Sequence, residues 1–238
     1  MAASKKKNKE INHNNLVTTK PLTDNQKLVF STWKAGKNQF LFGAAGTGKT
    51  FISLYLALKD VFDLKKPYDK VVLVRSLIPT REIGFLPGDE EDKAALYQVP
   101  YQNMVQFMFE QPNEQSFSNL YTRLKSQGSL FFLSTSFLRG LTFDNSIIIV
   151  DECQNLNFHE LDTIITRVGQ DSKIVFSGDF YQTDLVKQND KNGLHTFLRI
   201  LEEMEEFHCL EFTIGDIVRS GFVRNYIINK MKLGIGIE

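Results

Sequence analysis

Glycines, a lysine and a threonine stand close together in one eight-residue stretch, at the spacing G-x-x-x-x-G-K-[ST]. Glycine allows the backbone to curl so that consecutive N–H groups point at phosphate oxygens. The lysine at this spacing reaches the β- and γ-phosphates of a nucleotide, and the last hydroxyl ligates Mg²⁺. The stretch is therefore predicted to bind a nucleoside triphosphate with Mg²⁺, Lys49 being the catalytic cation and Thr50 a metal ligand. Its residues are Gly43, Ala44, Ala45, Gly46, Thr47, Gly48, Lys49 and Thr50.

The residues on both sides of this stretch fit the strand–loop–helix context that the motif requires. Residues 38–42 form a short apolar run suited to a buried strand, and residues 51–58 carry apolar side chains at helical spacing. The helix would direct the positive end of its dipole at the phosphates.

A pair of carboxylates follows another apolar run, residues 147–150. Asp151 is predicted to lie in the magnesium shell, and Glu152 to orient and deprotonate the attacking water. Strands often end in surface acids, but together with Lys49 the pair forms the Walker B arrangement. Gln182, which follows the run 173–176, is predicted to hydrogen-bond both the γ-phosphate and the attacking water.

The base is predicted to be adenine. The guanine-reading motif N-K-x-D is absent, since residues 189–191 do not match it. Gln26, upstream of the loop, has two interpretations that the sequence leaves open. It reads the adenine edge, or it completes a capping box with Thr23 at the start of a helix.

Composition and charge exclude several classes of protein. The chain has 238 residues, 42% of them hydrophobic, and 28 basic against 28 acidic side chains, which excludes a bulk nucleic-acid coat. No apolar run approaches the ~20 residues of a membrane span, and the N-terminus lacks the apolar core of a secretory signal. Cys153 and Cys209 form neither a disulfide framework nor a metal-binding spacing. We expect a soluble, cytoplasmic protein with no membrane partner.

One α/β domain is predicted over residues 21–238, after a flexible Lys-rich tail at residues 1–20. Continuous apolar runs predict parallel strands that are buried on both faces. Helices alternate with them, so the fold class is a doubly wound parallel sheet whose ligand lies at the carboxyl ends of the strands. The predicted strands are 38–42, 71–74, 130–133, 147–150, 173–176 and, more weakly, 209–212. The helices lie at about 24–33, 51–58, 90–110, 115–127, 157–168, 192–206 and 219–232.

Residues 89–128 are predicted to be a helical insertion rich in aromatic residues. Aromatic rings stack on exposed bases with about 1–3 kcal/mol each. Few lysines or arginines accompany these rings, so contacts in the core and between subunits are favoured over nucleic-acid binding. The aromatic residues are Tyr97, Tyr101, Phe107, Phe109, Phe117 and Tyr121.

A specific pattern of motifs extends over five stretches of the chain. They are residues 81–89, 137–143, 151–155, 178–185 and 216–219. Over about residues 23–228 the chain resembles the PhoH family. The resemblance implies a P-loop NTPase with a RecA-like core similar to that of superfamily 1 helicases, which uses ATP and Mg²⁺. It also implies a homo-oligomer, a hexameric ring, with single-stranded RNA or DNA as a partner.

Many short members of this family are encoded by bacteriophages, and such an origin would place the protein in the host cytoplasm. Relatives usually have Pro at the position of Ala44 and Ala at that of Cys153, both small changes. An Arg-Pro pair is replaced here by Arg75 and Ser76. Neither a nuclease domain nor a second RecA-like domain is expected within the chain, so a neighbouring subunit would have to complete the ATP site.

Hydrolysis usually needs a cation beside the developing γ-phosphate charge, which contributes about 10³–10⁵ in rate. Arg139, Arg167 and Arg219 are the candidates, and Arg167 has the pattern of a surface residue on a helix. The hypothesis is that Arg219 or Arg139 reaches the site of an adjacent subunit. Arg75, beside a strand end, either contacts nucleic acid or organises the site.

These observations favour an ATPase that hydrolyses ATP at a subunit interface and acts on RNA or DNA. The alternative is a nucleotide-gated ring that serves as a scaffold or binding module with little turnover, against which Glu152 argues. A small-molecule kinase is disfavoured because no Arg-rich lid segment is visible.

Overall fold

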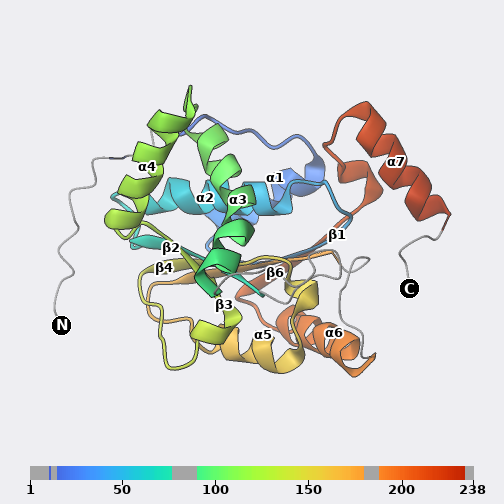
Figure 1. The fold of residues 1–238 in the computed structure, drawn as a ribbon. Coiled ribbons are helices and arrows are strands. Elements are labelled where there is room, and N and C mark those ends of the chain that lie inside the picture. Colours follow the sequence, from blue (N-terminus) through green and yellow to red (C-terminus); the bar gives the residue numbers. More distant parts are fainter. Residues whose placement is uncertain (1–10, 12–14, 77–89, 180–187, 234–238) are drawn as a thin grey trace.

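A single sheet of six parallel strands forms the centre of the molecule (Figure 1). The structure is a computed structural model that describes residue 11 and residues 15–76, 90–179 and 188–233. The strand order is β3-β2-β4-β5-β1-β6. The strands are β1 (Asn38–Gly43), β2 (Lys70–Arg75), β3 (Leu130–Ser134), β4 (Ser146–Val150), β5 (Lys173–Ser177) and β6 (Phe207–Phe212).

Helices cover both faces of the sheet, while α7 lies apart near the C-terminal end (Figure 1). The prediction of a doubly wound parallel sheet is therefore confirmed. The first face carries α1 (Asp24–Lys34), α2 (Lys49–Val61), α3 (Glu90–Met108) and α4 (Glu114–Ser126); the second carries α5 (Phe158–Ile165) and α6 (Gln188–Glu202), and α7 spans Gly221–Lys232.

Each face has its own hydrophobic core, because neighbouring residues of a strand point to opposite sides. In β4, Ile147 and Ile149 pack into the core beneath α2, whereas Ile148 and Val150 pack into the core over α5 and α6. This explains why the central strands read as continuous apolar runs.

One edge strand is less buried than the sequence predicted. Residues 130–133 were expected to be buried on both faces, but β3 lies at one edge of the sheet and the Phe131 side chain is 41% exposed. The expectation was wrong because a sheet edge lacks a neighbour on one side, which an apolar run cannot reveal. β6, the weaker strand in the sequence, forms the other edge.

Two helices end at least three residues before their predicted limits. α6 ends at Glu202 rather than at 206, and α5 ends at Ile165 rather than at 168. The four residues after Glu202 include three glutamates, Glu203, Glu205 and Glu206. Their negative charge opposes the partial charge at a helix C-terminus, so continued helix is disfavoured there.

The chain packs against the domain before residue 21. Ile11 and Leu16 are buried in the core on the α1–α4 side, and the Val17 N–H donates to the Met108 carbonyl at 2.8 Å. These apolar side chains lie within the segment that was expected to be a flexible tail. Among the residues described, no helix combines the length and apolar character needed to cross a bilayer.

The predicted insertion supplies α3 and α4, and most of its aromatic side chains join the core. Tyr97, Tyr101 and Phe109 are buried, and Phe117 and Tyr121 pack on the core beneath them. Phe107 is the exception, with 64% of its surface exposed.

Candidate functional site

The glycine-rich stretch forms a curled loop between β1 and α2. Gly43, Gly46 and Gly48 adopt positive φ angles of 106°, 74° and 82°. A Cβ on Gly43 would lie 2.2 Å from the Phe212 carbonyl oxygen on the neighbouring strand, so only glycine fits this position. Gly48 caps α2 without a side-chain hydrogen bond to the helix.

The Lys49 ammonium group is buried within this loop. Its Nζ donates to the carbonyl oxygens of Gly43 at 2.9 Å and Ala44 at 2.8 Å, and only 8% of the residue is exposed. Burial lowers the pKa of Lys49, against the opposing effect of Asp179, Asp151 and Glu152. A cation held in a desolvated loop suits a phosphate oxygen as its counter-ion.

The carboxyl end of β4 brings an acidic side chain to the same loop. The Thr50 hydroxyl donates to Asp151 Oδ1 at 2.8 Å, although the two residues are far apart in sequence. Burial raises the pKa of the Asp151 carboxyl, and the negative charge of Glu152 adds to the effect. A hydroxyl and a carboxylate in contact, beside a buried lysine, fit the oxygen ligands that Mg²⁺ prefers.

Glu152 is held by a glutamine that the sequence analysis did not single out. Gln154 Nε2 donates to Glu152 Oε2 at 2.6 Å, and Gln154 Oε1 accepts the Asp179 N–H at 3.0 Å. Glu152 itself has a left-handed backbone, with φ of 52°. A Cβ on Gly178, directly after β5, would lie 2.7 Å from Gln154 Oε1 and from Cys153 Sγ, so a larger residue here would displace these side chains.

Gln26 connects the start of α1 to the loop. Its Nε2 donates to the Thr47 carbonyl at 2.9 Å, and its Oε1 accepts the Leu22 N–H at 2.7 Å. Thr23 accepts the Gln26 N–H at 3.2 Å, which is one half of a capping box. The side chain of Gln26 turns to the loop and to Leu22 rather than to the N–H of Thr23. Reading of adenine stays a prediction.

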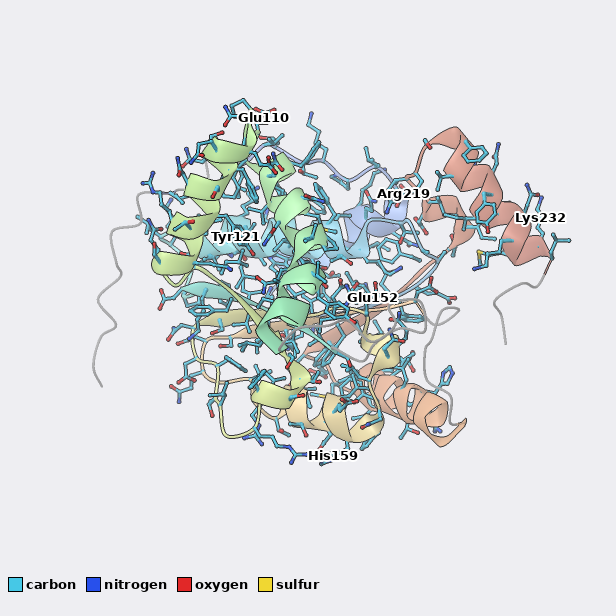
Figure 2. All side chains as sticks on the ribbon, in the orientation of Figure 1. Glu110, Tyr121, Glu152, His159, Arg219 and Lys232 are labelled. Carbon is cyan, nitrogen blue, oxygen red and sulfur yellow. The ribbon has the colours of Figure 1, made fainter. Side chains whose placement is uncertain are left out.

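The arginine candidates lie in different places. Arg219 is exposed, and its Cγ would be 2.9 Å from a Cβ on Gly46 of the same chain. The Val218 N–H also donates to the Gly46 carbonyl at 3.0 Å, which joins the segment before α7 to the loop. Figure 2 labels Arg219 beside α7 and Glu152 at the centre of the molecule.

Arg139 lies in the exposed segment between β3 and β4. Four steps in strand order separate β3 from β1, or about 19 Å at the usual spacing of strands. The strand before Arg139 is therefore well separated from the strand of the loop, and the role of Arg139 stays a prediction. Gln182 lies outside the described residues, and its predicted contact with the γ-phosphate stays a prediction.

A second contact to Asp151 was also missed. The Tyr101 hydroxyl donates to Asp151 Oδ2 at 2.7 Å. In the sequence Tyr101 was one aromatic residue of an insertion, and no spacing links it to β4. Arg75, which was expected to touch nucleic acid or to organise the site, lies 5.3 Å from the centre of the Tyr97 ring.

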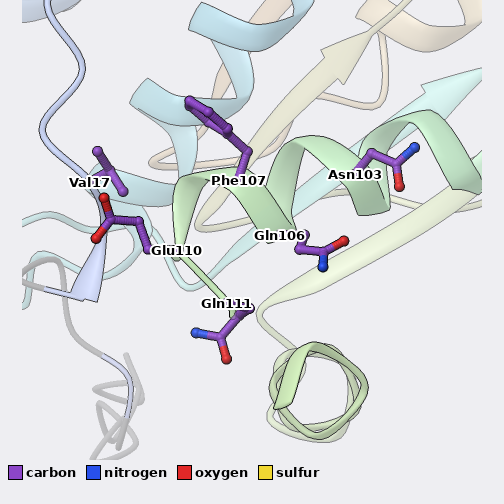
Figure 3. Close-up of a pocket in the computed structure, with 6 residues that line it drawn as sticks. All are labelled: Val17, Asn103, Gln106, Phe107, Glu110 and Gln111. Carbon is purple, nitrogen blue, oxygen red and sulfur yellow. The ribbon is translucent and has the colours of Figure 1, made fainter. Parts of the chain in front are cut away.

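An open cavity of about 370 Å³ lies elsewhere, at the C-terminal end of α3 (Figure 3). None of the predicted nucleotide-site residues lines it. Its walls are mostly amide and apolar side chains, and we assign no ligand to it. The lining residues are Val17, Asn103, Gln106, Phe107, Glu110 and Gln111.

The parallel sheet, the loop after β1 and the acid after β4 define the class of protein. It is an α/β P-loop NTPase with a RecA-like sheet, in which β5 lies between the strand of the loop and the strand of the acids. The family model described as "PhoH-like protein" matches residues 18–231. The chain belongs to the PhoH family, as its motifs predicted.

Several curated relatives share this name. The chain is 30% identical over 211 residues to a "PhoH-like protein" of Mycobacterium bovis, an alignment that covers 88% of this chain and 57% of the relative. It is 32% identical over 183 residues to "Protein PhoH" of Escherichia coli, covering 76% and 49%. The chain thus spans about half the length of the curated relatives it matches.

Among solved structures, the chain is similar to the crystal structure of the Pif1 helicase from Candida albicans. The TM-score is 0.41 at 17% identity, and the alignment covers 90% of this chain and 44% of that chain.

Proposed function

We propose that the protein hydrolyses ATP in a Mg²⁺-dependent reaction. One observation carries this proposal: the Thr50 hydroxyl and Asp151 Oδ1 are 2.8 Å apart beside the buried Lys49 ammonium group. Two segments that are remote in sequence thus supply the cation and the metal ligands of one triphosphate site. Bound Mg²⁺ would neutralise charge on the β- and γ-phosphate oxygens.

Each residue of the proposed site has a separate task in this reaction. The loop N–H groups and Lys49 bind the phosphates, and Thr50 and Asp151 hold the metal. Glu152 accepts a proton from the attacking water, and Gln154 fixes the orientation of its carboxylate through the 2.6 Å hydrogen bond. Gln182 is proposed to contact the γ-phosphate.

Adenine recognition is assigned to Gln26. Its amide uses one N–H on the Thr47 carbonyl and one lone pair on the Leu22 N–H. A primary amide has two donors and two lone pairs, so one of each remains for a base edge. The same amide contacts the loop, and this contact would link the presence of the base to the loop.

A neighbouring subunit is proposed to complete the site. Arg139 is exposed and follows β3, a strand about 19 Å from β1 across the sheet, which supports a role in the site of another copy. Arg219, beside Gly46 of its own chain, suits its own site. A head-to-tail contact of this kind closes into a ring, which we propose to be hexameric. Coupling of hydrolysis to single-stranded RNA or DNA is inferred from the family.

The decisive experiment is phosphate release from ATP, with and without Mg²⁺ and single-stranded RNA or DNA, together with the mass of the assembly. We expect Glu152→Gln to keep nucleotide binding and to lose hydrolysis by about 10²-fold or more. Lys59→Ala is the matched control, because Lys59 is an exposed lysine at the other end of α2. Tight ATP binding without turnover in the wild type would favour the scaffold instead.

A further inference from the structure

The Asp151 carboxylate is held on both oxygens by side chains from two different helices. Thr50, in the first turn of α2, donates to Oδ1 at 2.8 Å, and Tyr101 of α3 donates to Oδ2 at 2.7 Å. The Tyr101 residue is 2% exposed. A carboxylate with both oxygens bonded cannot rotate freely, so its two oxygens keep distinct neighbours.

Tyr101 is in turn held by Arg75, at the end of β2. The Arg75 guanidinium lies beside the phenolic hydroxyl of Tyr101 and 5.3 Å from the centre of the Tyr97 ring. Tyr97 and Tyr101 are four residues apart, so they lie on the same face of α3, and both contact Arg75. The chain of contacts runs from β2 through α3 to the acid of β4.

A tyrosine that only filled the core would not need this acceptor. Phenylalanine gives the same apolar burial, and a buried tyrosine usually satisfies its hydroxyl with whichever polar group lies near. Here the acceptor is the carboxylate that would serve Mg²⁺, and a cation, Arg75, lies beside the phenol. Hydrogen bonds from outside a metal site fix the orientation of carboxylate ligands and change metal affinity about 10- to 100-fold.

We propose that Tyr101 is a positioning residue that orients Asp151 toward the metal, and that Arg75 holds Tyr101 in place. The inference deepens the proposed function and rests on it. Tyr101 holds Oδ2 from the α3 side, which leaves Oδ1, the oxygen nearer Thr50 and the loop, to face the metal. It also gives α3 a direct connection to the nucleotide site.

The test compares Tyr101→Phe with Tyr55→Phe in the full chain. Tyr55 is an equally buried tyrosine of α2, 3% exposed, whose ring packs near Phe30 and Lys59. The first measurement is binding of Mn²⁺, by electron paramagnetic resonance, to protein holding a non-hydrolysable ATP analogue. The second is the Mg²⁺ concentration that gives half-maximal phosphate release.

We expect Tyr101→Phe to raise the dissociation constant for Mn²⁺ and the half-maximal Mg²⁺ concentration about tenfold or more. Nucleotide binding in EDTA should be unchanged. Tyr55→Phe should match the wild type. Arg75→Met should shift metal binding in the same direction, and adding it to Tyr101→Phe should cause little further change, because both act through one contact. This second variant keeps the test valid if Tyr101→Phe folds poorly.

The outcomes separate the two proposals. Metal binding that is unchanged in both Tyr101→Phe and Arg75→Met overturns the positioning role, even where thermal stability falls. A wild type that binds Mn²⁺ with the analogue but releases no phosphate overturns hydrolysis and leaves the positioning role intact.

Discussion

Two buried lysines lie at opposite ends of the sheet, and their surroundings differ. Lys49 follows the carboxyl end of β1, and Lys173 begins β5 at the amino end. They are 8% and 3% exposed, and burial lowers the pKa of both, that of Lys173 to about 8. Burial of a lysine and a shifted pKa therefore occur at both ends.

The groups that surround each lysine distinguish the two sites. Lys173 Nζ donates to the Trp33 carbonyl at 3.0 Å and lies 4.4 Å from the centre of the Trp33 ring, at the C-terminal end of α1. Lys49 lies in a loop of left-handed glycines and faces Asp151 and Asp179. A cation at the end of a helix stabilises structure, whereas a cation with curled amides and acids around it forms an anion site.

The largest expected effect comes from exchanging each lysine for methionine. Lys49→Met should reduce phosphate release about 10⁴-fold or more, since both the binding of the phosphates and the charge beside the γ-phosphate are lost. Lys173→Met should leave turnover within about twofold, because the site is at the far end of the sheet. Phosphate release and circular dichroism are measured on both variants. Equal losses of activity in correctly folded variants would show that Lys49 and Lys173 do not differ in their importance for turnover.

The next prediction tests which arginine completes the ATP site of a neighbouring subunit. Arg139→Ala alone should lower turnover about 10³-fold if it supplies the cation. Mixing Arg139→Ala subunits with Lys49→Ala subunits should restore activity, because some interfaces then pair an intact loop with an intact Arg139. Mixing Arg219→Ala with Lys49→Ala should restore nothing, since Arg219 lies at its own loop. Rescue of the Arg219 variant at any ratio would reverse these roles.

A smaller effect is expected where β5 approaches the acids. Gly178→Ala places a methyl group 2.7 Å from both Gln154 Oε1 and Cys153 Sγ, so Gln154 must move and release Glu152. We expect about a tenfold loss of turnover and a lower melting temperature. Gly221→Ala is the matched control, since nothing lies within 4 Å of its added Cβ. Normal turnover in Gly178→Ala would show that Glu152 does not depend on this contact.

The sequence predicted most of the fold and the centre of the site. Continuous apolar runs located five strands, a weaker pattern located β6, and the alternation with helices gave the parallel sheet. Local spacing and strand ends also predicted that Thr50 and Asp151 lie together, while the roles of Lys49, Thr50 and Asp151 stay predictions. Such signals lie within a few residues of one another, and the sheet brings them together by a general rule.

The contacts that connect separate elements were not predictable. The Tyr101–Asp151 hydrogen bond depends on how α3 packs over the strand ends, and an aromatic-rich helix gives no sign of it. Gln154 lay inside a recognised motif, yet its link to Asp179 depends on the spacing of β4 and β5. The hydrogen bond from Lys173 to the Trp33 carbonyl was not predicted either, because the strand residues give no sign that the end of α1 lies beside them.

The last prediction leaves turnover unchanged and concerns stability with pH at the amino end of the sheet. The pKa of Lys173 is about 8 in the folded chain against an ordinary value of 10.5. Between these values the unfolded chain binds more protons, so the free energy of unfolding should rise with pH by roughly 2–3 kcal/mol. Urea unfolding is measured between about pH 8 and pH 10 on the wild type and on Lys173→Met, which lacks the group. Since the variant shares every other titrating residue, parallel curves would mean that Lys173 keeps its ordinary pKa, and that burial at this end of the sheet is less complete than at Lys49.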